Sequence, residues 1–231
     1  MTGSTPEDLT ATAYQRIRSM ILHQDFRPGE RTSVARMAEA TGLSRAPVRS
    51  AVERLATEGL LRLRGRSGTY VAKLDRPDIE RLFELRALYE SAAAPLITER
   101  ITERQLDAIG RLVADLSPAP ARDDRSPRAR MLRFIDADVA FHEGIIAGAD
   151  NPYLIKHYSS LNLHLLISHY LMFEGGTNAA QRHREHLYIT EALKERDAVA
   201  LAAALVRHTE AVREAILSTM DELARRAAAP Q

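Results

Sequence analysis

Apolar residues recur at helical spacing over most of the chain. Between residues 9 and 24 they fall on one face of a helix, as Ala13, Ile17 and Ile21 do. The Phe-Arg-Pro-Gly turn at 26–29 ends this helix, because proline and glycine together interrupt helical structure. The pattern therefore predicts an amphipathic helix over 9–24.

Two short helices around a tight turn are predicted next. Ser33 can cap a helix over 34–40, and Gly42 stops that helix. Ser44 can cap a second helix over 45–58, in which apolar residues recur every three or four positions. Two short helices joined by a glycine-containing turn are typical of a helix-turn-helix.

A β-hairpin is expected after these helices. Residues 60–64 and 69–72 are β-prone and flank a turn that contains Gly65 and Gly68. The helices and the hairpin together predict a winged helix-turn-helix domain over residues 8–76.

The remainder of the chain carries no strand signal after Pro77, and we expect an all-α antiparallel bundle over residues 77–226. The predicted fold class is therefore mainly α. Asp78 and Thr102 are the expected caps of the first two helices of the bundle. The predicted helices cover 78–100, 102–116, 129–148, 152–174, 178–195 and 197–226, and a proline-rich loop covers 117–128. On the first of them, the side chains expected to face the core are Leu82, Leu85, Leu88 and Tyr89.

Composition narrows the classes of function. The 231 residues include no cysteine, which excludes a disulfide scaffold, a thiolate zinc site, an iron–sulfur cluster and a cysteine nucleophile. No apolar run approaches the roughly 18 residues of a membrane span, and the N-terminus lacks a signal-peptide pattern. We therefore expect a cytoplasmic protein with no membrane segment, in which His, Asp or Glu would hold any metal.

The charges are divided unevenly along the chain. Residues 1–76 hold 13 Lys and Arg against 8 Asp and Glu, whereas residues 77–231 hold 19 against 23. The net charge of +1 thus combines a basic first part with a mildly acidic second part. This asymmetry favours an anionic partner for the first part alone, although charge by itself could arise by chance.

Arginines gather on the predicted winged helix. Arg45 and Arg49 are four residues apart on one side of the second helix of the motif, and Arg36 lies on the helix before it. Arginine suits bidentate contact with guanine and phosphate, and Ser44 begins a helix whose N-terminus could bind a phosphate. Each arginine alone could be a solvated surface residue, but their grouping favours double-stranded DNA as the partner.

A possible metal site lies in the second part. Asp138 and His142 share a face of one predicted helix, and His186 and His208 lie on two later helices among apolar neighbours. One carboxylate and three imidazoles in a bundle core would bind a borderline divalent cation, with Zn, Ni, Fe and Mn not distinguished. Histidines that are only packed in the core, or a competing pair of His183 with His186, are the alternatives.

Two other classes of function remain open from the residues. A helical metalloenzyme would need a general base beside a metal-bound water, and Glu143 points roughly 100° around the helix from His142. A constitutive dimeric DNA-binding protein, in which the bundle only dimerises, is the second alternative. An intact Asp-His-His-His set argues against the latter.

Specific motifs follow one another between residues 10 and 73. They read FRPGER at 26–31, MA at 37–38, GLSRAPVRSAVERL at 42–55, EGL at 58–60 and RSGTYV at 66–71. In this order they resemble the GntR family of bacterial transcription regulators, and the chain departs from the family pattern at 32–36, where Ala35 removes one possible base contact. The resemblance implies DNA contacts from Arg36, Ser44, Arg45, Ala46, Pro47 and Arg49, and from the wing tip at Arg66, Ser67 and Gly68.

The second part also carries ordered motifs. ELRALYE at 84–90, DVAFH at 138–142, DNPYL at 150–154 and EH at 185–186 look like the all-helical ligand-binding domain of the FadR subgroup, the FCD-type domain, in its shorter six-helix VanR-like branch. The resemblance implies a metal at Asp138, His142, His186 and His208, and it makes a fatty-acyl effector less expected. We expect a homodimer that reads a palindromic operator, and a small organic acid as effector, because an open coordination position of the metal would accept a carboxylate. The effector-binding candidates are Arg86, which could instead pair with Glu90, and the weaker Asn162 and His164.

Overall fold

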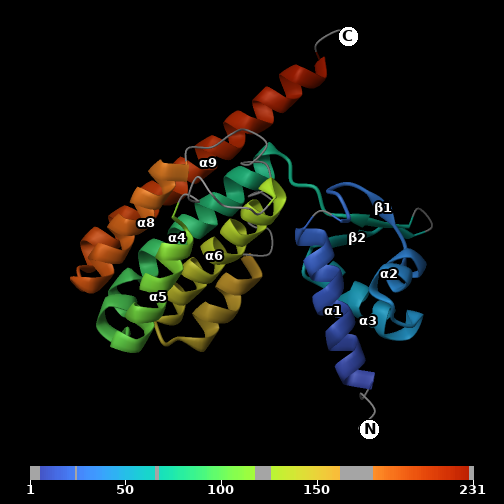
Figure 1. Cartoon of the computed structure of the whole chain (residues 1–231), viewed down its shortest axis with the longest axis horizontal. Coiled ribbons are helices and arrows are strands. Elements are labelled where there is room, and N and C mark those ends of the chain that lie inside the picture. The colour runs from blue at the N-terminus through green and yellow to red at the C-terminus, as the bar shows by residue number, and fades with distance from the viewer. Residues whose placement is uncertain (1–5, 24, 66–67, 118–125, 162–178, 229–231) are drawn as a thin grey trace. The chain divides into compact units, whose positions relative to one another are not determined.

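The computed structural model describes residues 6–23, 25–65, 68–117, 126–161 and 179–228. The chain divides into two compact units, Met1–Leu74 and Asp75–Gln231. Figure 1 shows a first unit of helices and a small sheet and a second unit of helices in its described part. Within the described residues, no helix is long and apolar enough to cross a membrane.

The first unit contains the three expected helices. They are α1 (Pro6–Leu22), α2 (Val34–Thr41) and α3 (Arg45–Thr57). Ser33 caps α2 as predicted, because its side chain accepts a hydrogen bond from the backbone N–H of Arg36. Gly42 ends α2 in the left-handed conformation, with φ of 69°. The turn between α2 and α3 is therefore set by a glycine, as in a helix-turn-helix.

The expected hairpin is part of a three-stranded antiparallel sheet. The strands β2 (Leu61–Leu63) and β3 (Thr69–Val71) form the hairpin, and β1 (Arg31–Thr32) pairs with the other edge of β3. The strand β1 was not predicted, because a strand of two residues carries no alternating pattern. β1 directly precedes the cap of α2, so it ties the helix-turn-helix to the wing.

The core of the first unit forms where α1 and α3 pack together with the sheet (Figure 1). Val48, Val52 and Leu55 of α3 are buried as predicted, and Met37 of α2 is buried with them. Burial of these apolar side chains fixes the orientation of α3, so that its opposite face is exposed to solvent.

The second unit is a bundle of long helices. In the described ranges these are α4 (Arg76–Arg100), α5 (Glu103–Asp115), α6 (Pro127–Ala147), α8 (Ala179–Lys194) and α9 (Ala198–Ala228), and residues 152–161 are also helical. The longest, α9, packs along α4, and its C-terminal end projects beyond the other helices of this unit (Figure 1). The predicted helix over 152–174 lies outside the described residues from 162 onward.

The start and the buried face of α4 differ from the prediction. Asp75, not Asp78, is the N-cap, and Asp78 completes a capping box three residues later. Leu85 and Leu88 were expected in the core, but they are 43% and 60% exposed. The side chains of α4 that face the interior are Ile79, Phe83, Arg86, Glu90, Ala93, Ala94 and Ile97. The prediction failed because it followed the leucines, whereas the buried face of α4 includes a charged pair.

The turn between α8 and α9 is hydrogen-bonded to the C-terminal end of α4. The guanidinium of Arg196 donates to the carbonyls of Thr98 and Ile101 at 3.0 and 2.9 Å. Asp197 accepts hydrogen bonds from two backbone N–H groups in the first turn of α9, at 2.9 Å each. These contacts fix the turn between α8 and α9 against the end of α4. They hold in register the helices that carry the polar groups described next.

Candidate functional site

The exposed face of α3 presents two free cations. Arg45 and Arg49 are exposed, and no ion pair to either is present among the described residues. Ser44 is the N-cap of α3, but its side chain makes no capping hydrogen bond. Ala46 is exposed and Pro47 is half-buried on the same first turn. Unpaired guanidinium groups beside an open helix N-terminus make this face suitable for phosphate and base contacts.

Arg36 lies in a different environment. Its guanidinium forms an ion pair with Glu30 and lies over the ring of Phe26, at 5.2 Å from the centroid. The carboxylate of Glu30 also accepts the backbone N–H of Arg27 at 2.8 Å, and this hydrogen bond, more than the charge of Arg36, lowers the pKa of Glu30. Arg36 is therefore bound by residues of its own unit, unlike the two arginines of α3.

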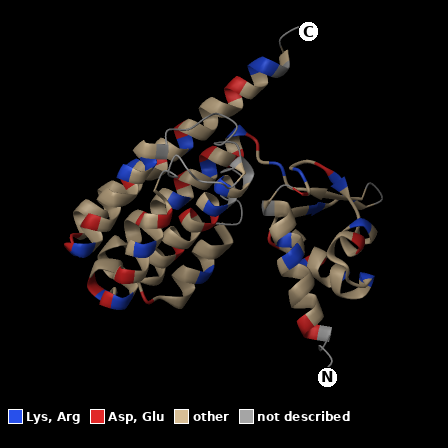
Figure 2. Ribbon diagram, viewed as in Figure 1, with Lys and Arg blue, Asp and Glu red and all other residues tan. Residues whose placement is uncertain are grey.

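The wing places Gly68 at the start of β3. Its φ of 103° favours glycine, and a Cβ there would lie 3.2 Å from Nε of Arg31. The other two predicted wing-tip residues, Arg66 and Ser67, lie outside the described residues. In Figure 2 basic segments are visible along the strands and on the helices of the first unit.

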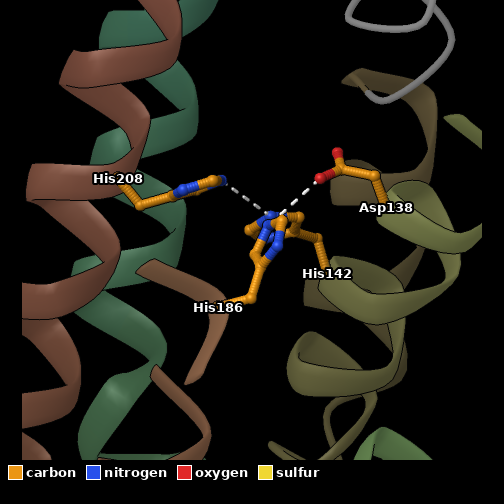
Figure 3. A group of neighbouring side chains, drawn as sticks. All are labelled: Asp138, His142, His186 and His208. Carbon is orange, nitrogen blue, oxygen red and sulfur yellow. Dashed lines mark hydrogen bonds and ion pairs between the residues drawn. The ribbon is translucent and has the colours of Figure 1, made fainter. Parts of the chain in front are cut away.

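The predicted metal ligands come together in the second unit. Asp138 and His142 lie on α6, His186 on α8 and His208 on α9, and all four are buried. One potential ligand atom from each lies within 4.8 Å of all the others. Figure 3 shows His208 and Asp138 approaching from opposite sides, with His142 and His186 between them. Three helices thus supply one compact donor set of the kind that binds borderline divalent cations.

The distances within this cluster fit donors that share one ion. Nε2 of His142 and Nε2 of His208 are 3.3 Å apart, and Nε2 of His186 is 3.1 Å from Oδ1 of Asp138. Two ligands of a tetrahedral ion with bonds of about 2.05 Å would lie about 3.3 Å apart. The two ring nitrogens of His186 are buried, and neither has a hydrogen-bond partner among the described residues. A cation bound between these atoms would satisfy them.

A carboxylate lies close to Nδ1 of two of the histidines. Nδ1 of His142 lies 3.2 Å from Oε1 of Glu90, and Nδ1 of His208 lies 3.0 Å from Oε2 of Glu185. A proton on Nδ1 that faces a carboxylate leaves the lone pair on Nε2. Both Nε2 atoms would then direct lone pairs at one another, an arrangement that favours a cation between them.

The protonation of these histidines is consistent with metal binding. Burial lowers the pKa of His142, and the nearby charge of Arg86 lowers it further. Burial also holds the pKa of His208 well below its ordinary value, with His186 and His142 acting in the same direction. Neutral imidazole is the form that ligates a metal, and burial favours this form in both rings.

Glu90 connects the cluster to three other parts of the unit. Its carboxylate accepts hydrogen bonds from Nε of Arg86 at 2.9 Å, from the hydroxyl of Tyr158, and from the hydroxyl of Thr209 at 3.0 Å. Burial raises the pKa of Glu90, but the charge of Arg86, followed by that of His142, outweighs it and lowers the pKa to about 2. Glu90 is therefore a buried anion that joins α4 to α6, to the 152–161 helix and to α9.

Arg86, predicted to bind an effector, is buried against this anion. Burial lowers its pKa, but the charge of Glu90 more than compensates and raises it overall. Its pairing with Glu90 is the alternative that the sequence left open. One terminal nitrogen of Arg86 has no hydrogen-bond partner within the described ranges. The other effector candidates, Asn162 and His164, lie outside the described residues.

Sequence reasoning missed three polar residues near the cluster. Glu90 was considered only as a partner of Arg86, and Glu185 was noted only as the neighbour of His186. Arg182 was not considered, although it precedes His186 by one helical turn and is buried. The spacing of four residues on α8 was the available signal.

Comparison with known proteins agrees with this architecture. The model of the bacterial regulatory proteins of the gntR family matches residues 9–71, and the FCD domain model matches residues 81–211. The Nta operon transcriptional regulator of Aminobacter aminovorans is 27% identical over 191 residues, covering 83% of this chain and 86% of the relative. The transcriptional repressor RspR of Escherichia coli is 26% identical over 209 residues, covering 90% of this chain and 89% of its own.

Solved structures share the fold. McbR/YncC of E. coli superposes with a TM-score of 0.79 at 20% identity, covering 92% of this chain and 98% of its own. A GntR transcriptional regulator from Rhodococcus sp. RHA1 gives a TM-score of 0.72 at 19% identity, covering 90% and 97%. The family matches together span both units and the names of the relatives are those of regulators, which sets aside the metalloenzyme interpretation. The chain belongs to the GntR family of bacterial regulatory proteins, with a C-terminal FCD domain, and is a transcription regulator and not an enzyme.

Proposed function

We propose that this regulator is a homodimer whose binding to a palindromic operator is controlled by a small organic acid at a metal-containing site. The observation that carries the metal-dependent part is the grouping of four buried ligand atoms within 4.8 Å. Asp138, His142, His186 and His208 would hold a divalent ion, which would supply a Lewis-acidic position for an anionic oxygen. The acid is the class of ligand that this position suits.

The DNA contacts are assigned to the first unit. Arg45 and Arg49 on the exposed face of α3 would read base edges in the major groove, with Ala46 and Pro47 close to them. Ser44 at the N-terminus of α3 would bind a phosphate. The wing tip at Arg66, Ser67 and Gly68 would add contacts around this centre, and Arg36 would join them only when its ion pair with Glu30 opens.

Two features support a homodimer: the two-fold symmetry of a palindromic operator and the exposed apolar surface of α4. Two winged helices on a two-fold axis would read two half-sites. Leu85 and Leu88 expose apolar surface on α4, beside a groove of about 340 Å³ that Tyr89, Ala92 and Leu96 help to line. Apolar surface of this kind favours a subunit interface. Light scattering after gel filtration should give about twice the chain mass of 25.7 kDa.

Glu90 offers a route from the metal site to the DNA-binding unit. It lies against His142 on one side and belongs to α4 on the other, and α4 begins directly after the first unit ends. An acid that enters the metal site would displace the groups around His142 and shift the populations of α4 positions. We expect the acid to release the operator, the behaviour of a repressor, which is also the name that the relative RspR carries.

The test combines metal analysis with DNA binding. Elemental mass spectrometry of the purified wild type should find about one divalent ion per chain, and His186→Ala should lose it. His157→Ala, which alters an exposed histidine on the 152–161 helix, is the matched control and should keep the ion. His186→Ala should still bind operator DNA but no longer respond to acids. Wild type without metal would contradict the metal site and favour a constitutive DNA-binding dimer.

A second measurement tests the recognition helix. Arg45→Ala should weaken operator binding by roughly 1–3 kcal/mol and relax sequence preference at one position. Arg184→Ala, an exposed arginine on α8, should leave operator affinity unchanged. Equal operator affinity of the Arg45→Ala variant and the wild type would reject the assignment of α3.

A further inference from the structure

Arg182 is a buried cation whose Nε has no hydrogen-bond partner among the described residues. Its side chain on α8 is 7% exposed. No carboxylate of the described residues forms an ion pair with it. A buried, unpaired guanidinium is costly, so folded proteins retain one where an anion binds.

Arg182 lies on the buried face of α8 that also carries His186 of the metal cluster. Arg182 and His186 are one turn apart on the same face of α8, and both are buried. Burial lowers the pKa of Arg182, whereas the charges of Asp138 and Glu185 act in the opposite direction. These two carboxylates belong to the cluster, since Asp138 contacts His186 and Glu185 contacts His208.

Arg86, the other buried arginine of the described residues, differs from Arg182. It forms a close ion pair with Glu90, whose carboxylate also receives two hydroxyl groups. The positive charge of Arg86 is therefore already neutralised within the fold. Arg182 has no such close ion pair with a carboxylate of the described residues, so its charge is available to a ligand.

The charge of the site defines the class of ligand. A divalent ion, Arg86 and Arg182 would bring four positive charges, and Glu90, Asp138 and Glu185 bring three negative ones. One negative charge is needed to balance the described groups, which is the charge of a single carboxylate. A carboxylate has two oxygens, so it can reach a metal ion with one and a guanidinium with the other.

We propose that Arg182 is the second anchor of the effector, binding the carboxylate of a small monocarboxylic acid that also reaches the ion held by Asp138, His142, His186 and His208. This inference rests on the proposed metal-dependent function and deepens it, because it names the effector as a monoanion and the side chain that selects it. Arg182 is a ligand-binding residue in this assignment and not a structural one.

The experiment uses full-length protein loaded with Co²⁺, whose visible spectrum reports an anion that enters the coordination shell. Acetate is the probe, and acetamide is its uncharged control. The variants are Arg182→Gln and Arg182→Lys, and Arg184→Gln alters an exposed arginine two residues away on α8 as the matched control. Elemental mass spectrometry measures the metal content, and circular dichroism measures Tm without metal or acid.

Wild type and Arg184→Gln should bind acetate but not acetamide. Arg182→Gln should bind acetate about 10- to 100-fold more weakly, as expected for the loss of a charged hydrogen bond. Its metal content should be unchanged, and its Tm without acid should stay equal or rise, because an unpaired buried charge has been removed. Arg182→Lys keeps the charge without the planar fork, and its acetate affinity should lie between the two.

Two results would overturn the assignment of Arg182 and leave the metal site intact: equal acetate affinity of wild type and Arg182→Gln, or a cobalt spectrum of wild type that acetate does not change. A lower Tm of Arg182→Gln without acid, restored in Arg182→Lys, would identify a structural arginine. Should the glutamine variant not fold, unchanged acetate affinity in the lysine variant would reject the inference. Wild type that holds no Co²⁺ would contradict the metal-dependent function itself.

Discussion

Glu90 Oε1 lies 3.2 Å from Nδ1 of His142, so a buried carboxylate of α4 contacts a proposed metal ligand of α6. The same carboxylate neutralises Arg86. We therefore expect two roles for this side chain: it stabilises the buried guanidinium of Arg86, and it holds the imidazole ring of His142 in place.

Glu90→Gln should affect both roles. Loss of the negative charge leaves Arg86 unpaired in the core, which should lower the free energy of unfolding by about 3–5 kcal/mol. The affinity for metal should fall about 10- to 100-fold, because His142 loses its orienting partner. Urea unfolding and a competitive metal titration measure these effects.

The matched control is Glu84→Gln on the exposed face of α4. It changes the same charge on the same helix and should shift stability by less than about 0.5 kcal/mol. Unchanged metal affinity in Glu90→Gln would mean that Glu90 serves the ion pair alone.

The metal-free protein should lose stability as the pH falls below neutral. The pKa values of His142 and His208 lie below their ordinary value in the folded state, mainly because both rings are buried. The unfolded chain therefore takes up protons near about pH 6.5, where the folded protein does not. Stability is present above that pH and is lost as the pH falls through it toward the lower folded values.

Urea unfolding of the metal-free protein at pH 7.5, 6.5 and 5.5 measures this loss. The slope should not exceed about 1.4 kcal/mol per pH unit for each histidine. His208→Gln should flatten the dependence, and His157→Gln should leave it unchanged. A stability that is constant between pH 7.5 and 5.5 would show that the two rings are protonated equally in both states.

The sequence predicts helices more reliably than their buried faces. The bounds of α3 and α5 follow from caps and periodicity, and the Thr102 capping box forms as its sequence indicates. The buried face of α4 was misassigned because Arg86 and Glu90 occupy core positions, and a hydrophobic pattern cannot include a pair of charges. The strand β1 was not predicted, because the strand with which it pairs is distant in sequence.

Replacement of two glycines by alanine should change the stability of the protein in opposite directions. Gly42 ends α2 at φ of 69°, where a Cβ meets no atom within 4 Å but the backbone conformation is strained for alanine. Gly42→Ala should therefore destabilise the first unit by about 1 kcal/mol. Gly110 lies inside α5 with equally open space and without positive φ, so Gly110→Ala should stabilise the second unit by about 0.5–1 kcal/mol.

Thermal unfolding of the two variants gives the comparison. The pair separates backbone strain from side-chain crowding, because neither new methyl group meets a neighbour. Destabilisation by both substitutions would indicate that crowding, not φ, decides the result at these positions.

The grouping of Asp138, His142, His186 and His208 was predictable from the sequence, but the groups around it were not. Asp138 and His142 share a helix face by their spacing, His186 and His208 lie among apolar neighbours on two later helices, and the family resemblance supported the set of four. Which carboxylate stands behind which imidazole depends on the packing of α4, α6, α8 and α9. Spacing along one helix cannot reveal that relationship. Glu90 and Arg182 could be identified only from the structure, because both side chains are buried and Nε of Arg182 lacks a partner among the described residues.

Glu30 should restrain the DNA affinity of this regulator. Its carboxylate holds the guanidinium of Arg36 in an ion pair, so Arg36 cannot make a phosphate contact without breaking that pair. Glu30→Gln removes the charge but keeps an oxygen that can accept the backbone N–H of Arg27. Released Arg36 should then bind a phosphate, raising operator affinity and steepening the dependence of log K on log salt by about 0.9.

Fluorescence anisotropy with operator DNA from 50 to 200 mM salt measures this change. The double variant Glu30→Gln with Arg36→Ala should return the slope to the wild-type value, because the added contact depends on Arg36. A slope that steepens equally in both variants would assign the effect to the loss of a repulsive carboxylate. A slope unchanged in the single variant would place Arg36 outside the DNA contact, leaving α3 as the basic surface that binds the operator.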